Sequence, residues 1–231
     1  MEDKESYRWI ESLISIDKKF FNEEQVIVTI GDRESDIYDL FLVDRKRNSH
    51  LLVRAAQDRL INHEDKKLFK GLDNLEVKGN LEVDISRKKG VSSRKAKLNI
   101  KYDKFEIKEP KNHKKNIHSV SLNVILVEEE KSGESKEPIR WVLLTTLDIN
   151  SLEDAIKYVR WYSYRWLIER YHYVLKSGCH IEELQLDSSD KIQKVLAMYS
   201  VVSCKLLNMT YIVRKEPELS CEAFFQKKNG I

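Results

Sequence analysis

Four polar side chains of different chemistry recur at helical spacing in the C-terminal third of the chain. Tyr162, Arg165, Glu169 and Lys176 are offset by three, four and seven residues within the stretch WYSYRWLIERYHYVLKSGCHIEELQL. At about 100° per residue, a single helix would place these side chains within an arc of about 60°. A carboxylate would then share one edge with a phenol and two cations. Such an edge could hold a divalent metal beside a bound phosphate.

A second candidate carboxylate, Asp32, follows the short apolar run from Val26 to Ile30, which Gly31 ends. A β-branched run of this length predicts a strand buried on both faces, and HLLVRAA at 50–56 predicts another. Open α/β sheets place their sites beyond the carboxyl ends of such strands. Asp32 and Glu169 are therefore candidate Mg²⁺ ligands, and Arg54 is a candidate neighbour of Asp32.

Each of these features also has an ordinary structural explanation. Glu169 and Arg165 could form an i, i+4 ion pair on a helix surface, with Lys176 solvated. Asp32 could cap a short helix that the sequence predicts from about Glu34 to Leu40. From the residues alone, both interpretations stay open.

Hydrophobic periodicity predicts the elements that would position these groups. Alternation of apolar and polar residues between 75 and 127 indicates antiparallel strands, whereas 3.6-residue periodicity elsewhere indicates helices. The predicted elements are a helix over 4–15, antiparallel strands within 75–127, a strand over 139–147, a helix from Ser151 to Ser177 and a helix from about Asp190 to Arg214.

Composition narrows the class of protein. With 231 residues, 41% of them apolar, the chain can bury a core of one or two domains, and three Pro and seven Gly exclude fibrous classes. The three cysteines form no C-x-x-C pair, so neither a disulfide framework nor a zinc module is indicated. No apolar run of about 18 residues and no N-terminal signal region occurs. These features predict a soluble cytoplasmic protein with no membrane partner.

Positive charge is concentrated between residues 87 and 115. This segment contains twelve Lys or Arg and three acidic residues, although the net charge of the whole chain is only +3. A phosphate backbone selects such a basic run. A solvated face of a β-rich region would carry the same residues, and charge alone leaves both interpretations open.

Two motifs resemble a known family. The spacing of Tyr162, Arg165, Glu169 and Lys176 resembles the Y-R-E-K signature of DDE transposases in the insertion sequence four family, and GDRESDIYD at 31–39 resembles the segment with that family's second catalytic aspartate. The resemblance implies a mixed α/β (α+β) fold, with a partial ribonuclease-H-like core and an antiparallel β-rich insertion. The domains that it implies are 1–58 and 138–215 as two parts of the core, 59–137 as the insertion, and 216–231 as a tail.

The resemblance also implies a function: cut-and-paste transposition, with Asp32 and Glu169 as catalytic ligands of Mg²⁺ or Mn²⁺. Tyr162, Arg165, Lys176 and Arg54 would contact double-stranded DNA at the transposon ends. Trp141 matches a tryptophan that stacks on a flipped base, although an apolar strand would also bury such a residue. A second copy or a full-length transposase is the expected protein partner.

The sequence departs from the family pattern at the first catalytic aspartate. Only 31 residues precede Asp32, and Asp3 and Asp17 flank a predicted helix instead of ending a strand. We therefore expect a fragment truncated at both ends, with little strand transfer of its own. The alternatives are a non-catalytic DNA- or partner-binding remnant, inhibitor-like or left by a decayed gene, and an unrelated nuclease of the same fold.

Overall fold

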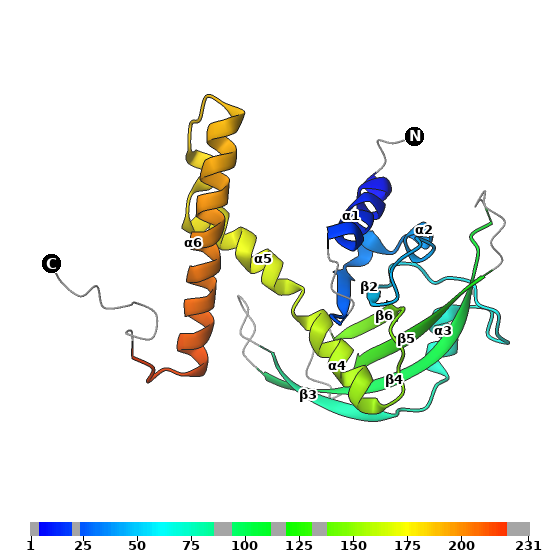
Figure 1. Ribbon diagram of the computed structural model, residues 1–231. Coiled ribbons are helices and arrows are strands. Elements are labelled where there is room, and N and C mark those ends of the chain that lie inside the picture. The colour runs from blue at the N-terminus through cyan, green and yellow to red at the C-terminus, as the bar shows by residue number, and fades with distance from the viewer. Residues whose placement is uncertain (1–4, 20–23, 86–93, 112–118, 131–137, 221–231) are drawn as a thin grey trace. The chain divides into compact units, whose positions relative to one another are not determined.

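The computed structural model describes residues 5–19, 24–85, 94–111, 119–130 and 138–220 (Figure 1). The chain divides into two compact units, Met1–Ser163 and Tyr164–Ile231, which are described separately. The first unit contains α1 (Glu5–Lys19), β1 (Ile27–Gly31), the 3-10 helix η1 (Arg33–Ser35), α2 (Tyr38–Phe41), β2 (Ser49–Arg54), α3 (Leu68–Asp73), β3 (Gly79–Ile85), β4 (Arg94–Lys108), β5 (Ser119–Glu129), β6 (Arg140–Thr145) and α4 (Leu152–Ser163).

The strands of the first unit form one curled, mixed sheet in the order β1-β2-β6-β5-β4-β3 (Figure 1). β1 and β2 are parallel, with Gly31 opposite Val53, and the other neighbours are antiparallel. The predicted mixed α/β fold is confirmed, as is the antiparallel pairing of the alternating segments between 75 and 127. Strands β3 to β5 extend the same sheet that β1 and β2 begin.

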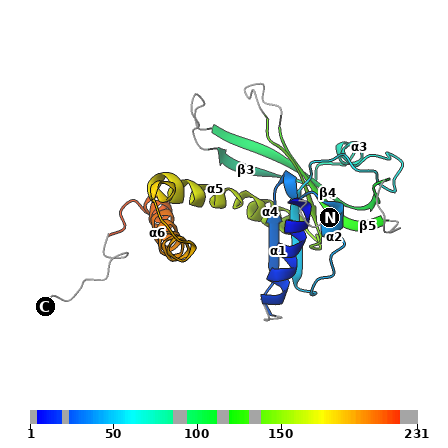
Figure 2. The same ribbon diagram turned by 90° about the horizontal axis from the view of Figure 1, so that it is seen from above.

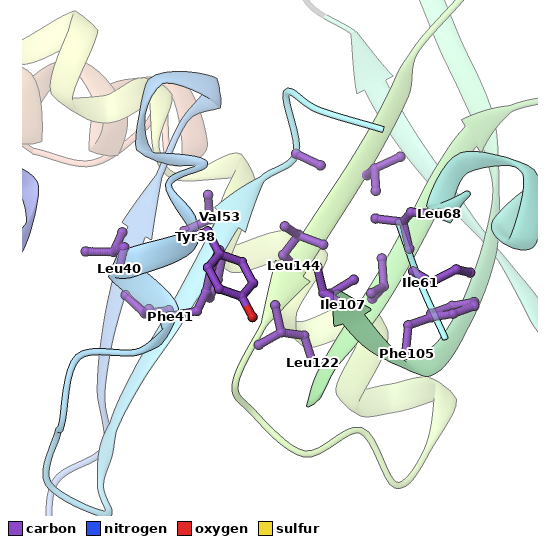
Figure 3. Packing of buried hydrophobic residues seen from close by; sticks show 14 of the residues in the cluster. Tyr38, Leu40, Phe41, Val53, Ile61, Leu68, Phe105, Ile107, Leu122 and Leu144 are labelled. Carbon is purple, nitrogen blue, oxygen red and sulfur yellow. The ribbon is translucent and has the colours of Figure 1, made fainter. Parts of the chain in front are cut away.

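One face of the sheet packs against α1, α2 and α3. Because side chains alternate along a strand, Leu51 and Val53 of β2 face this side, where Leu13 of α1 and Phe41 of α2 complete the core. Figure 3 shows this packing at close range, with Leu144 of β6 and further side chains of β4, β5 and α3. The core forms because helices with one apolar face cover the apolar face of the sheet.

The opposite face packs against α4. Leu152 at the start of α4 lies over Gly79 of β3, where a Cβ atom would stand 2.3 Å from Leu152 Cδ2. At the other end of α4, Tyr162 packs against Trp141 of β6. Gly79 and Trp141 belong to one row of paired residues across four strands. Helix α4 therefore crosses the sheet from β3 to β6, and its C-terminal end lies at the start of β6.

The second unit is helical. It contains α5 (Trp166–Tyr173), the π-helical segment η2 (Val174–Gly178), the 3-10 helix η3 (Ile181–Glu183) and α6 (Ser189–Lys215), which Figure 2 shows from above. Tyr171 OH donates a hydrogen bond of 2.8 Å to Ser200 Oγ, and Trp166 packs on Tyr211. The predicted last helix is confirmed as α6. By length and composition alone, α6 is also apolar enough to cross a membrane.

The predicted single helix from Ser151 to Ser177 is wrong. α4 ends at Ser163, and the N–H groups of Leu167 and Ile168 donate to carbonyls three residues back, at 2.9 and 3.2 Å. Ser163 Oγ donates to the Arg160 carbonyl at 2.6 Å, a local bond that competes with the helical ladder. The boundary between the two units falls at this break, so Tyr162 does not share one continuous helix with Arg165, Glu169 and Lys176.

Candidate active site

Asp32 follows the last residue of β1, as the sequence predicts. Its backbone is extended, and its Oδ1 accepts the Glu34 N–H at 3.0 Å, so it caps η1. Ser35 Oγ donates to the Asp32 carbonyl at 2.7 Å and closes the turn. Asp32 is therefore both a helix cap and a half-buried carboxylate at the carboxyl end of a parallel strand.

Gly31 is required by the close approach of this turn to β1. A Cβ atom at Gly31 would lie 2.0 Å from Ser35 Oγ and 2.7 Å from Ser35 Cβ, and Ser35 is buried. We expect Gly31→Ala to destabilise the first unit by about 1–3 kcal/mol, because overpacking must shift the turn that carries Asp32. Urea unfolding followed by circular dichroism measures this change.

Gly178→Ala is the matched control for Gly31→Ala. Its Cβ would meet only Val174 Cγ1 at 3.5 Å, an ordinary contact, so we expect no loss of stability there. Equal losses for both variants would contradict a close approach specific to Gly31.

Asp36 joins the turn after β1 to the segment after β2. Its Oδ2 accepts the N–H groups of Ala56 at 2.7 Å and Gln57 at 3.0 Å, and its Oδ1 accepts Arg59 Nη2 at 2.6 Å. Both side chains of this ion pair are buried. Neither Asp36 nor Arg59 is among the candidates that the sequence indicates, and the two residues are 23 positions apart. The only local signal is a charged residue directly before the apolar pair Ile37 and Tyr38, and nothing in the sequence indicates Arg59.

Arg54 is the last residue of β2 and lies one position beyond the Gly31–Val53 pair. The parallel register therefore places it beside Asp32 at the same end of the sheet. Its Nη2 donates to the Arg140 carbonyl at 3.2 Å, which ties β2 to the start of β6. The structure thus brings Asp32 and Arg54 to neighbouring strand ends.

Trp141 and Tyr162 are in contact on the face that α4 covers. Their ring centroids are 5.4 Å apart at an interplanar angle of 64°, an edge-to-face arrangement. Tyr162 is only 4% exposed, whereas Trp141 is partly buried. The expectation that Tyr162 shares one exposed edge with Arg165 is wrong, because the packing of α4 on the sheet buries its ring.

Arg165, Glu169 and Lys176 lie in the second unit and are paired with carboxylates or cations of their own unit. Arg165 Nη2 lies 2.7 Å from Glu169 Oε1, and Lys176 Nζ lies 2.7 Å from Glu182 Oε1. The i, i+4 pair is therefore confirmed. The Glu169 side chain is 62% exposed and that of Lys176 55%, so these groups remain accessible to a ligand.

The candidate metal ligands fit the chemistry of Mg²⁺, which prefers carboxylate oxygens and keeps waters and substrate phosphates as its other ligands. Asp32 belongs to the first unit and Glu169 to the second. Within the ranges that the structure describes, no three His, Cys, Asp or Glu side chains gather as a metal cluster. Either carboxylate by itself would leave most of a metal's coordination sphere to water and phosphate oxygens.

The basic run is partly neutralised where the structure describes it. Residues 87–93 and 112–115 lie outside the described ranges. On β4, the cations of Lys97 and Lys101 pair with Glu130 at 3.0 Å and Glu128 at 3.2 Å. Lys95, Lys104 and Lys108 are exposed. The structure therefore assigns part of the run to ion pairs within the sheet and leaves other cations facing solvent.

Comparison with known protein families gives a match that covers most of the chain. Residues 22–204 match the family described as the transposase DDE domain. The matched range includes Asp32, Arg54, Trp141, Glu169 and Lys176, and it spans most of the first unit and part of the second.

Proposed function

The chain belongs to the transposase DDE domain family, and from this premise we propose that it acts in cut-and-paste transposition as a member of the insertion sequence four group. It would bind transposon-end DNA and contribute Asp32 and Glu169 to phosphodiester hydrolysis and strand transfer. The observation that supports this proposal most directly is the position of Asp32, which directly follows a strand parallel to the one that Arg54 ends.

Asp32 and Glu169 would hold Mg²⁺ or Mn²⁺ through their carboxylate oxygens. When bound, the metal supplies an activated water or 3′-hydroxyl and stabilises the leaving oxygen of the phosphodiester. The chain's own groups orient the DNA around it. Arg54, beside Asp32, would bind a backbone phosphate, because a guanidinium donates two parallel hydrogen bonds to phosphate oxygens.

Arg165 and Lys176 would bind further phosphates of the DNA. Both now pair with exposed carboxylates, Glu169 and Glu182, and exposed ion pairs contribute only about 0–1 kcal/mol. Exchanging these partners for a phosphate therefore costs little. If Arg165 binds a phosphate in place of Glu169, the Glu169 carboxylate becomes available to bind the metal. A single exchange of partners would then prepare both the phosphate contact and the metal ligand.

Trp141 would stack on a base flipped out of the duplex. Flipping costs a few kcal/mol, which stacking on an aromatic face can partly offset. Tyr162 contacts Trp141 edge-to-face and would fix the orientation of its ring. In this proposal Tyr162 acts through Trp141, since its own ring is buried.

Replacing Glu169 tests this proposal. The chain is incubated with supercoiled DNA that carries the sequences flanking its gene, with Mn²⁺, and nicking is followed on a gel. We expect any nicking by the native chain to be lost in Glu169→Gln, because the amide is a poor metal ligand. Glu218→Gln is the control, since Glu218 is an exposed carboxylate of the same unit outside the matched range, and should nick normally.

Three other outcomes would contradict the proposal. DNA binding without nicking would favour the non-catalytic remnant, and nicking that survives in Glu169→Gln would exclude the assigned carboxylate. Cleavage without preference for the flanking sequences would indicate a nuclease of the same fold.

A further inference from the structure

An exposed aromatic side chain at the end of α5 has a cation on one of its faces. Tyr173, the last residue of α5, is 60% exposed, and the guanidinium carbon of Arg170 lies over its ring, 5.5 Å from the centroid. A cation–π contact of this kind orients a ring and covers one of its two faces. With more than half of its surface exposed, Tyr173 keeps the other face open to solvent.

Two other aromatic side chains of α5 serve the fold of the second unit. Trp166 packs on a tyrosine of α6, and the hydroxyl of Tyr171 donates to a serine of α6, so both hold the two helices together. Tyr173 differs, because its one ring contact among the described residues is with Arg170. The Arg170 guanidinium in turn forms no ion pair with a carboxylate in the described part of the chain. Both side chains are therefore available to a ligand.

Tyr173 lies on the same helix face as the candidate metal ligand. Arg165, Glu169 and Tyr173 follow one another at intervals of four residues, and residues four apart on a helix are neighbours. Lys176 follows in η2, with its side chain 55% exposed. With Arg170, this short segment therefore carries three cations close to one carboxylate and one open aromatic ring.

This combination matches the chemistry of an unpaired nucleotide. Proteins that bind single-stranded DNA stack its bases on aromatic side chains and hold its backbone with nearby cations. A base inside a duplex already stacks on its neighbours, so only an unpaired base can offer a face to Tyr173. An aromatic side chain of a protein partner could also cover the ring, but it would supply no phosphate for the cations.

We propose that Tyr173, with Arg170 behind its ring, stacks on an unpaired base at an end of the bound DNA. This stacking subsite rests on the proposed function, because it places that nucleotide about one helical turn from Glu169. It adds a contact for single-stranded DNA to the phosphate contacts described above. Because every base has an aromatic face, the subsite should accept all four bases.

Binding of three labelled DNA hairpins to the full chain tests the stacking subsite. The hairpins share one duplex; one is blunt, and the others carry a single-stranded thymidine extension at the 3′ or the 5′ end. Fluorescence anisotropy is measured in EDTA, so cleavage does not enter. We expect Tyr173→Ala to weaken binding of an extended hairpin by about 5- to 100-fold, the effect of losing one stacked base, and to change binding of the blunt hairpin by less than about twofold. Tyr173→Phe should bind like the native chain, because it keeps the ring.

Tyr164→Ala is the matched control. Tyr164 is a tyrosine of the same unit with a similar exposed fraction, 57%, so its loss should leave the binding of all three hairpins unchanged. The dependence of affinity on salt should also stay the same in Tyr173→Ala, because stacking on a neutral ring releases no counterions. Circular dichroism of each variant should match that of the native chain, since both tyrosines lie on the surface.

The outcomes separate the stacking subsite from the proposed function. Native-like binding of both extended hairpins by Tyr173→Ala, or equal losses on the blunt and extended hairpins, would overturn the subsite and leave the role of Glu169 to the nicking assay. A loss in Tyr173→Phe as large as in Tyr173→Ala would also overturn it, because the ring would then not be the binding group. A native chain that binds none of the hairpins would overturn the subsite and DNA binding together.

Discussion

Replacing Asp36 by alanine is expected to destabilise the first unit by about 3–5 kcal/mol, the usual cost of leaving one partner of a buried ion pair alone. The substitution removes the acceptor of the Arg59 guanidinium and of two backbone N–H groups. The Asp36 side chain is fully buried, so water cannot replace the lost acceptor. The measurement is the urea midpoint of unfolding, compared at pH 7 with the native chain.

Two comparisons separate the ion pair from a general effect of losing an aspartate. Asp44 is exposed, and Asp44→Ala should change stability by no more than about 0.5 kcal/mol. Arg59→Met removes the guanidinium but leaves the two backbone N–H donors of the carboxylate, so it should destabilise less than Asp36→Ala. The double variant should destabilise less than the sum of the two, because the residues are in contact. Additive losses would show that Asp36 and Arg59 do not act as a pair.

The same variant bears on the candidate site. Asp36 follows Asp32 by four residues and anchors Ala56, two residues beyond Arg54. It therefore fixes the ends of β1 and β2 relative to each other. A folded chain without this anchor should bind DNA more weakly even though Asp36 itself contacts no ligand in the proposed arrangement.

Glu129 gives the second large effect, and it depends on pH. Its buried carboxylate accepts hydrogen bonds from the Arg94 guanidinium and from the Ile139 N–H at 3.1 Å. The hydrogen bond from Arg94 holds the pKa of Glu129 below the ordinary range of a glutamate carboxyl. Because the pKa is lower in the folded state, the contribution to stability is full above the unfolded pKa and is lost as the pH falls through the folded pKa.

The measurement is the free energy of unfolding from neutral pH into the acid range. We expect Glu129→Gln to lower it by about 2 kcal/mol at neutral pH, the size of a hydrogen bond to a charged group, and to flatten its dependence on acid pH. Glu130→Gln is the control in the adjacent position. Its pair with Lys97 is half exposed, so we expect a change below about 1 kcal/mol. If the free energy of unfolding of Glu129→Gln falls with acid pH as it does in the native chain, carboxylates other than Glu129 cause that fall.

Glu129 also matters to the candidate site through β6. Its N–H donates to the Ile139 carbonyl at 2.8 Å, and its side chain accepts from the Ile139 N–H. Ile139 directly precedes β6, and Trp141 lies two residues further on. Loss of these two hydrogen bonds should therefore change the environment of Trp141, which the fluorescence of a variant that keeps Trp141 as its one tryptophan can report.

Much of the fold was predictable from local patterns. The apolar run before Gly31 indicates a buried strand, and the alternation of apolar and polar residues in β4 and β5 indicates strands with one buried face. These local patterns are enough to identify the strands. The end of β1 also places Asp32 correctly. The break after Ser163 was not predictable, because the apolar periodicity continues across it while the local hydrogen bonds change.

The sequence by itself determined the strands, the long helix α6 and the position of Asp32 at a strand end, because these depend on residues close together in the chain. The tertiary structure alone decided that Tyr162 is buried against Trp141 and that Asp36 binds Arg59. Those contacts join residues 21 and 23 positions apart. The periodicity of apolar residues indicates that a side chain is buried, but which residue it contacts depends on how the whole sheet folds.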